Sequence, residues 1–120
     1  MDQVPDSLAR LKYLRELNLS RNKLSSFPDA LLQFVELRKL SLNRNEISRL
    51  PEEIDRLEKL EYLDVWDNPI PNFPENLVHL KMLNEFHAEG IKYGPKFQEK
   101  WIQRMPHTKF FFDAPCDCRE

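Results

Sequence analysis

Ser41, Asp64 and His87 are each 23 residues apart in the chain, and these three residue types form the catalytic triad of many hydrolases. In such a triad the histidine must lie between the serine and the aspartate. If the three residues occupy equivalent places on neighbouring parallel strands, the aspartate lies in the centre. Ser41 and His87 are then two strands, about 10 Å, apart. This order argues against a hydrolase, and we expect no enzymatic activity.

Metal binding is the next chemistry to consider, because Glu85, His87 and Glu89 alternate along the chain. On a strand their side chains would point the same way, with Asp64 close to His87 on the neighbouring strand, and these are ligand types for divalent metals. Steps of about 6.8 Å are nevertheless wide for shared coordination. A surface metal site is therefore a distant alternative to a solvated or partner-binding surface.

The two cysteines and two glycines offer little further chemistry. Cys116 and Cys118 could supply two thiolates, but a structural zinc site normally needs four ligands, and His107 is the one other soft ligand nearby. Gly90 and Gly94 do not begin a phosphate-binding motif. We expect no metal, no cofactor and free thiols near the C-terminus.

A period of 23 residues places the candidate groups relative to one another. It aligns apolar, asparagine and proline positions over most of the chain, and periods of this length are typical of solenoids. The clearest columns are Leu14, Leu37, Leu60 and Leu83; Leu17, Leu40, Leu63 and Phe86; Leu24, Ile47, Ile70 and Tyr93; Asn22, Asn45 and Asn68; and Pro28, Pro51 and Pro74.

Each repeat contains two kinds of segment. Leu40-Ser41-Leu42 and its equivalents alternate apolar with polar residues, which predicts short strands with the polar side chains outward. Behind Pro51 and its equivalents, apolar residues recur at three-residue steps after acidic residues, which favours single helical or 3₁₀ turns. Parallel strands should form one side and the turns the other, with the more closely spaced sheet side concave.

Residues 37–59 match every signature position of the leucine-rich repeat, and the 23-residue units resemble those of Ras-suppressor-like intracellular scaffolds and of many bacterial repeat proteins. The resemblance covers Val4 to about Ala88. It implies an α/β fold, a short right-handed solenoid with a curved parallel sheet on its concave side. It also implies that three asparagines form a buried ladder that bonds the backbone of successive turns: Asn22, Asn45 and Asn68.

We expect one domain over residues 1–120, with a partial repeat at 1–13 and full repeats at 14–36, 37–59 and 60–82. Residues 83–113 form a divergent last repeat with a helix-strand cap, and 114–120 form a tail. The cap is predicted from a helix over 96–105 and a final strand at 110–112. The apolar positions of this helix are Phe97, Trp101, Ile102 and Met105.

Composition and charge argue against two classes of partner, nucleic acids and membranes. The chain has 120 residues, 41% of them hydrophobic and 32% charged, and a net charge of −2, so no broad basic field favours nucleic acid. No apolar run approaches the roughly 20 residues of a membrane span, and residues 1–10 lack the pattern of a signal peptide. We expect a cytoplasmic protein with neither nucleic acid nor membrane as a partner.

The outward strand positions form the candidate partner-binding surface. Trp66 is its sharpest feature, because an outward tryptophan beside Tyr62 fits the centre of an interface, although it could also form a shallow patch against neighbouring side chains. Basic residues lie on the early strands and acidic residues on the late ones, so the late half complements a partner with an apolar anchor near a basic segment. The candidate residues are Tyr62, Asp64, Trp66, Asp67, Glu85, His87, Glu89, Lys39, Asn43 and Arg44.

Two functions follow from this surface. The first is a non-enzymatic interaction module that holds a protein or an extended peptide on the concave sheet face. The alternative is a structural scaffold fragment whose N-terminal end lacks a lid, so that it continues into further repeats or forms a weak homodimer through its edge.

Overall fold

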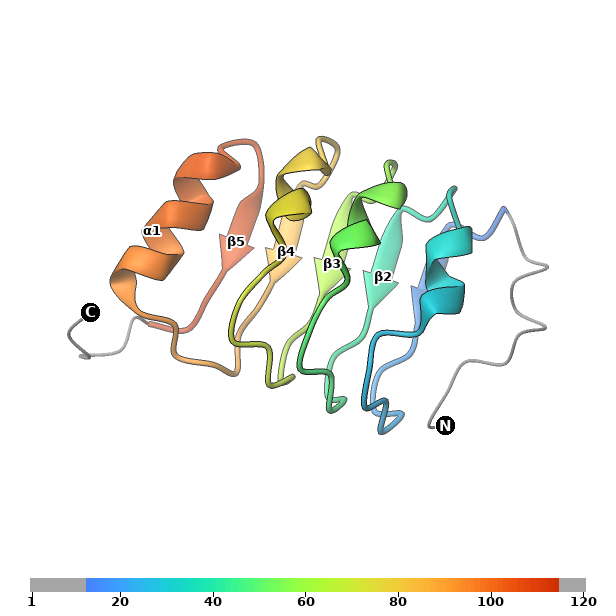
Figure 1. Ribbon diagram of the computed structural model, residues 1–120, viewed down its shortest axis with the longest axis horizontal. Coiled ribbons are helices and arrows are strands. Elements are labelled where there is room, and N and C mark those ends of the chain that lie inside the picture. Colours follow the sequence, from blue (N-terminus) through green and yellow to red (C-terminus); the bar gives the residue numbers. More distant parts are fainter. Residues whose placement is uncertain (1–12, 115–120) are drawn as a thin grey trace.

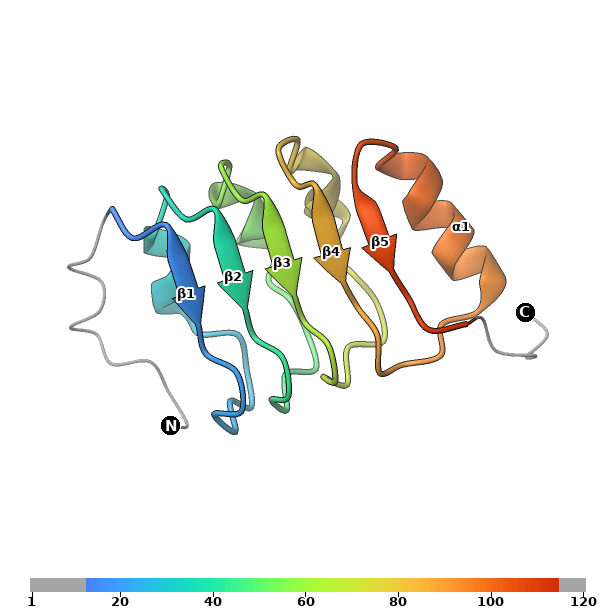
Figure 2. The same ribbon diagram turned by 180° about the vertical axis from the view of Figure 1, so that it is seen from behind.

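Five short strands lie side by side in the computed structural model, which describes residues 13–114 (Figure 1). All pairings are parallel, in the order β1-β2-β3-β4-β5. The strands begin one residue before the apolar-polar-apolar triplets that predicted the first three, and Figure 2 shows the sheet from its open side. They are β1 (Glu16–Asn18), β2 (Lys39–Ser41), β3 (Tyr62–Asp64), β4 (Glu85–His87) and β5 (Lys109–Phe111).

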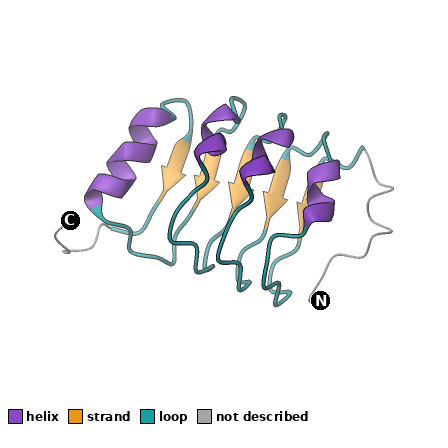
Figure 3. Ribbon diagram, viewed as in Figure 1, coloured by secondary structure: helices purple, strands orange, loops and turns teal. Residues whose placement is uncertain are grey.

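Three 3₁₀ helices and one α-helix cover the other side of the sheet (Figures 1 and 3). Pro28, Pro51 and Pro74 stand just before the 3₁₀ helices, with φ of −68°, −73° and −68°, rather than at their first helical position. Acidic residues follow each proline, as expected for a helix start. The helices are η2 (Asp29–Gln33), η3 (Glu52–Arg56), η4 (Glu75–His79) and α1 (Pro95–Arg104).

The core lies between these two layers and is built from the repeated apolar columns. Leu40 pairs with Leu63, and Leu63 with Phe86, so that equivalent residues of successive repeats stack in register. All three are fully buried, because the two-residue period of a strand turns them toward the 3₁₀ helices. This stacking and the parallel sheet confirm the predicted short solenoid.

The C-terminal cap closes one end of this core. The helix α1 lies one residue earlier than predicted. Trp101 on α1 and Met105, which directly follows α1, are fully buried, and the Trp101 ring lies 5.4 Å from that of Phe73. Ile102 was predicted to share this apolar surface, but 48% of it is exposed. Trp101 and Met105 are four residues apart and lie on one face of the helix, whereas Ile102 projects to one side.

The last strand joins the sheet with a small change of register. Phe86 pairs with Phe110, 24 residues later, because the ten residues of α1 replace the shorter 3₁₀ helix of the other repeats. Thr108 anchors the approach to β5, since its hydroxyl donates to the Leu83 carbonyl at 2.7 Å. Within residues 13–114, no helix is long and apolar enough to cross a membrane.

Candidate functional site

The asparagine column links one repeat to the repeat before it. The side-chain oxygen of Asn45 accepts hydrogen bonds from the backbone N–H groups of Asn22 and Leu24, at 2.9 and 3.0 Å. Its Nδ2 donates to the carbonyls of Leu19 and Leu42, at 3.0 and 2.8 Å. The carboxamide is buried, so it supplies hydrogen-bond partners to backbone groups that water cannot reach.

Asn68 repeats this arrangement one turn later. Its side-chain oxygen accepts from the Ile47 N–H at 3.0 Å, and its Nδ2 donates to the carbonyls of Leu42 and Val65 at 2.8 and 3.1 Å. Asn22 differs, because it is half-buried and its Nδ2 donates to the Ser20 carbonyl of its own turn. The hydrogen bonds of Asn45 and Asn68 thus join successive repeats in the same way.

We call the side of the sheet turned away from the 3₁₀ helices the sheet face. Its side chains form rows across the strands, because residues in equivalent places lie directly beside one another. The first row is Glu16, Lys39, Tyr62, Glu85 and Lys109; the second is Asn18, Ser41, Asp64, His87 and Phe111; and the 23-residue spacing gives a third row of Ser20, Asn43, Trp66 and Glu89.

Ser41 and Asp64 face this side but are only 9% exposed. Their short side chains lie among longer neighbours on strands about 4.8 Å apart. Asp64 also accepts hydrogen bonds from Asn43 Nδ2 at 2.8 Å and from the Trp66 N–H at 2.9 Å. An open hollow of about 400 Å³ lies over β1–β3 and includes both residues in its lining.

Aromatic rings continue the second row toward the C-terminal end. His87 stacks on Phe111 with ring centres 4.1 Å apart and an interplanar angle of 3°, and the Tyr62 ring lies 5.1 Å away on its other side. Sequence reasoning assigned Phe111 to the cap and missed its place on the sheet face. The sequence carries a signal for this position, because Phe111 follows His87 by 24 residues, one more than the repeat period. The extra residue lies in the segment that precedes β5.

Basic side chains cover three of the rings. Lys39 Nζ lies 5.0 Å from the ring centre of Tyr62, and the guanidinium of Arg44 lies 4.5 Å from that of Trp66. Lys109 Nζ lies 5.1 Å from the ring centre of Phe111. Such cation–π contacts hold rings and cations in fixed positions. Trp66 remains half-buried, with Arg44 as its neighbour in the preceding repeat.

Carboxylates surround the same rings. Glu85 Oε2 lies 3.9 Å from Nε2 of His87, and Glu89 Oε1 lies 3.7 Å from its Nδ1. Burial raises the pKa of the Tyr62 hydroxyl, and the negative charges of Asp64, Glu85 and Glu89 raise it further. Within the described part of the chain, no group of three or more His, Cys, Asp or Glu side chains is arranged to hold a metal ion.

The residues that directly follow the third row have an unusual backbone conformation. Arg21, Arg44 and Asp67 have φ of 57°, 56° and 59°, and Gly90 continues the column with φ of 105°. The left-handed turn leaves the side chains of Arg44 and Asp67 exposed at the rim of the sheet face. The predicted surface residues thus lie together on one side, whereas the three asparagines lie beneath it.

Cys116 and Cys118 lie outside the described residues.

Ser41, Asp64 and His87 lie in the order expected from the sequence. Asp64 stands between Ser41 and His87 in the second row, whereas a catalytic triad needs the histidine in the centre.

A family model described as a leucine-rich repeat region matches residues 1–105. Among solved structures, the chain is similar to a leucine-rich repeat protein of Leptospira interrogans, with 32% identity over 92% of this chain and a TM-score of 0.84. It is also similar in fold to an internalin of Listeria monocytogenes, with 23% identity over 93% of the chain and a TM-score of 0.77. A comparison with curated proteins found no match.

The leucine-rich repeat ectodomain of the receptor kinase SOBIR1 from Arabidopsis thaliana shares the fold at 20% identity over 95% of the chain, with a TM-score of 0.65. The chain spans 28% of the Leptospira protein, 32% of the internalin and 67% of the ectodomain chain.

Proposed function

Because the chain belongs to the leucine-rich repeat family, whose members are typically protein-interaction domains without catalytic activity, we propose that it binds a protein or an extended peptide on its sheet face. The proposed centre is Tyr62, Asp64, Trp66 and His87. The observation that carries the proposal is the half-buried Trp66 ring, which lies 4.5 Å from the Arg44 guanidinium on the same face as the neighbouring rings of Tyr62, His87 and Phe111. Tryptophan, tyrosine and arginine are the residues that most often dominate binding energy.

The low mobility expected of this surface supports the proposal. Asp64 is fixed by hydrogen bonds from Asn43 and from the Trp66 N–H, and His87 is held between two aromatic rings. Side chains that are already ordered lose little conformational entropy when a partner binds. Polar and aromatic side chains also lie together on neighbouring strands, so an extended chain lying across the strands could contact both kinds of group.

The experiment is a selection of short random peptides on the folded protein, followed by calorimetry of the selected peptides with variants. Trp66→Ala should weaken binding by about 2 kcal/mol or more, because it removes the central ring of the surface. The melting temperature should change little, since the ring is not part of the core. Ile102→Ala is the matched control, because it removes an exposed apolar side chain from α1 and should leave affinity unchanged.

Peptides that bind wild type and Trp66→Ala with equal affinity would place the interaction elsewhere and remove the proposal. Loss of binding in both variants would point to a general effect on folding, which the melting temperatures would reveal.

A structural scaffold is the second candidate, and it rests on the end of the sheet at β1. Leu17 is half-buried, whereas its equivalents Leu40 and Leu63 are fully buried. Among the described residues, an incompletely covered column and an edge strand favour stacking with further repeats or with a second copy. Light scattering tests this: a dimer that forms with rising concentration and disappears when a capping repeat is added at the N-terminus would support it. A constant monomer mass would exclude the homodimer.

A further inference from the structure

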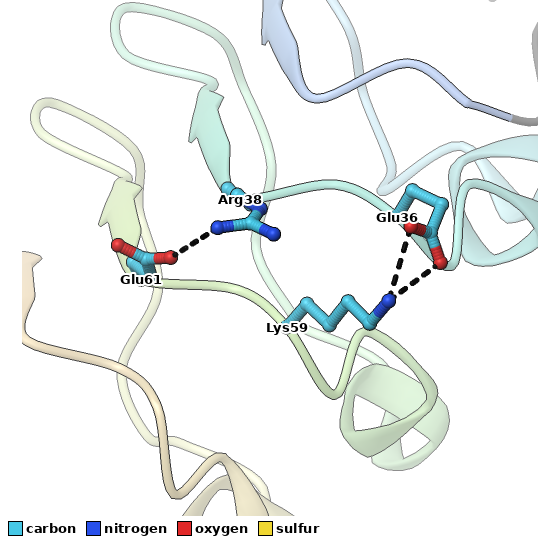
Figure 4. Close-up of polar contacts among 4 residues, drawn as sticks. All are labelled: Glu36, Arg38, Lys59 and Glu61. Atoms are coloured by element: carbon cyan, nitrogen blue, oxygen red, sulfur yellow. Dashed lines mark hydrogen bonds and ion pairs between the residues drawn. The ribbon is translucent and has the colours of Figure 1, made fainter.

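Charged side chains along one edge of the solenoid are paired with each other (Figure 4). Where η2 and η3 lead into the strands that follow them, Lys59 Nζ lies 2.9 Å from a carboxylate oxygen of Glu36, and Arg38 lies 3.4 Å from Glu61. On the helical side, Arg104 lies 2.6 Å from Glu75. Each pair joins one repeat to the next, so these carboxylates are neutralised within the molecule.

The sheet face is organised differently. Lys39, Arg44 and Lys109 lie over aromatic rings. Within residues 13–114, no lysine or arginine forms an ion pair with Glu85 or Glu89. Among the basic side chains of the described residues, only His87 lies within 4 Å of these carboxylates, at 3.9 Å from Glu85 and 3.7 Å from Glu89, and both distances are too long for hydrogen bonds.

Glu89 adds a second observation. Its Oε1 is shielded from solvent and has no hydrogen-bond partner within the described residues, although the side chain as a whole is 31% exposed. A shielded carboxylate oxygen without a donor is unfavourable, and a cation bound at the exposed part of the same side chain would offset its negative charge. Asp67 adds negative charge at the nearby rim.

From this contrast we propose that the patch of Tyr62, Trp66, Glu85, His87 and Glu89 binds a basic segment of the partner. Arginine or lysine side chains of that segment pair with Glu85 and Glu89, while its apolar parts lie against Trp66 and Tyr62. The proposal rests on the proposed function, because it assigns a partner chemistry to the same face. The carboxylates left unpaired here, unlike those at the solenoid edge, supply the charge complementarity.

The probe is an acetylated peptide of alternating arginine and threonine residues, and its comparison peptide carries neutral citrulline in place of each arginine. Binding is measured by calorimetry and by chemical-shift changes in the wild-type protein. We expect the arginine peptide to bind at least about tenfold more tightly than the citrulline peptide, a difference of about 1.4 kcal/mol. The shift changes should centre on β3 and β4, and added salt should weaken the binding.

The variant pair is Glu85→Gln with Glu89→Gln, which keeps the side-chain shape and removes both charges. Glu52→Gln with Glu53→Gln is the matched control, because it removes the same charge from η3 on the other side of the sheet. We expect about a tenfold loss of affinity for the arginine peptide in the first double variant and little change in the second.

Equal losses in both double variants, or shift changes away from β3 and β4, would overturn the inference, as would equal binding of the citrulline peptide. If selected peptides depend on Trp66 but lack basic residues, the basic-partner inference fails while the proposed function stands. If no selected peptide depends on Trp66, the proposed function itself fails.

Discussion

The carboxamide of Asn45 contacts backbone groups of two neighbouring repeats at once. The family resemblance implied this role, but the residue type alone would also fit an ordinary turn. Two positions show what the sequence could not reveal. Ser41 and Asp64 alternate with buried apolar residues as predicted, yet both are only 9% exposed. Longer side chains on neighbouring strands cover them, and the pattern of a single strand does not reveal such cover.

Asn45→Leu should lower the free energy of unfolding by about 3 kcal/mol or more, because each buried backbone group left unpaired costs about 1–3 kcal/mol. Asn84→Leu is the control at an exposed asparagine and should change stability by less than about 0.5 kcal/mol. Urea unfolding followed by circular dichroism measures both. Equal losses in the two variants would mean that the Asn45 bonds contribute little.

Gly90→Ala should destabilise the protein by about 1–3 kcal/mol. The residue has φ of 105°, and an added Cβ would lie 2.8 Å from the backbone nitrogen of Asp67 and 2.9 Å from its Cα. Gly94→Ala is the comparison, since Gly94 has an ordinary φ of −67° and should lose about 1 kcal/mol or less. Thermal unfolding measures the stability of both variants. A smaller loss of stability in Gly90→Ala than in Gly94→Ala would contradict the expected clash.

At the scale of elements, ion pairs join neighbouring segments that flank the sheet, and two of the pairs have the spacing of the repeat. Glu36 and Lys59 are 23 residues apart, and η4 is tied to α1 through Glu75 and Arg104. Apolar spacing predicted the strands and α1 to within one residue, because a few buried positions fix an element. The exposure of Ile102 and the sheet-face position of Phe111 depend on how α1 and β5 pack, which spacing does not specify.

These ion pairs should make stability depend on pH in the acidic range. The hydrogen bond from Lys59 and its charge lower the pKa of Glu36 below 4.5, and Arg104 does the same for Glu75. A carboxyl whose pKa is lower in the folded state stabilises the fold above its unfolded pKa. That contribution is complete above about pH 4.5 and is lost as the pH falls through the folded pKa.

Lys59→Met tests this link between repeats. Its stability should fall below that of the wild type at pH 7, and the difference should shrink as the pH falls through the lowered pKa of Glu36 in the folded protein. Lys92→Met removes an exposed lysine outside these pairs and should track the wild type at every pH. Chemical unfolding across the acidic range provides the comparison. A gap between Lys59→Met and the wild type that persists unchanged at low pH would exclude the ion pair as its cause.

The whole molecule is a row of units that contact their neighbours, closed at one end by α1. In such an architecture stability depends on each unit and on each interface between units. Sequence periodicity predicted this overall form because every repeat carries the same buried columns. The partner-binding role of the sheet face remains a proposal, since the same fold supports many surfaces.

Trp101→Ala should weaken the molecule from its C-terminal end. The side chain is fully buried against Phe73, so its truncation should cost about 3–5 kcal/mol, whereas Ile102→Ala on the exposed side of α1 should cost little. Amide hydrogen exchange should accelerate most in β4 and β5 and least in β1 and β2. Uniform acceleration along all five strands would instead indicate a single cooperative unit.

The direction of the asparagine bonds has a consequence for how the chain is made. Asn45 satisfies the Leu24 N–H and the Leu19 carbonyl, and Asn68 satisfies the Ile47 N–H, so these two turns receive a polar partner from the unit that follows them. During synthesis on the ribosome, which proceeds from the N-terminus, the newest turn always awaits the next unit. Folding should therefore trail translation by about one repeat until α1 and β5 emerge and close the series.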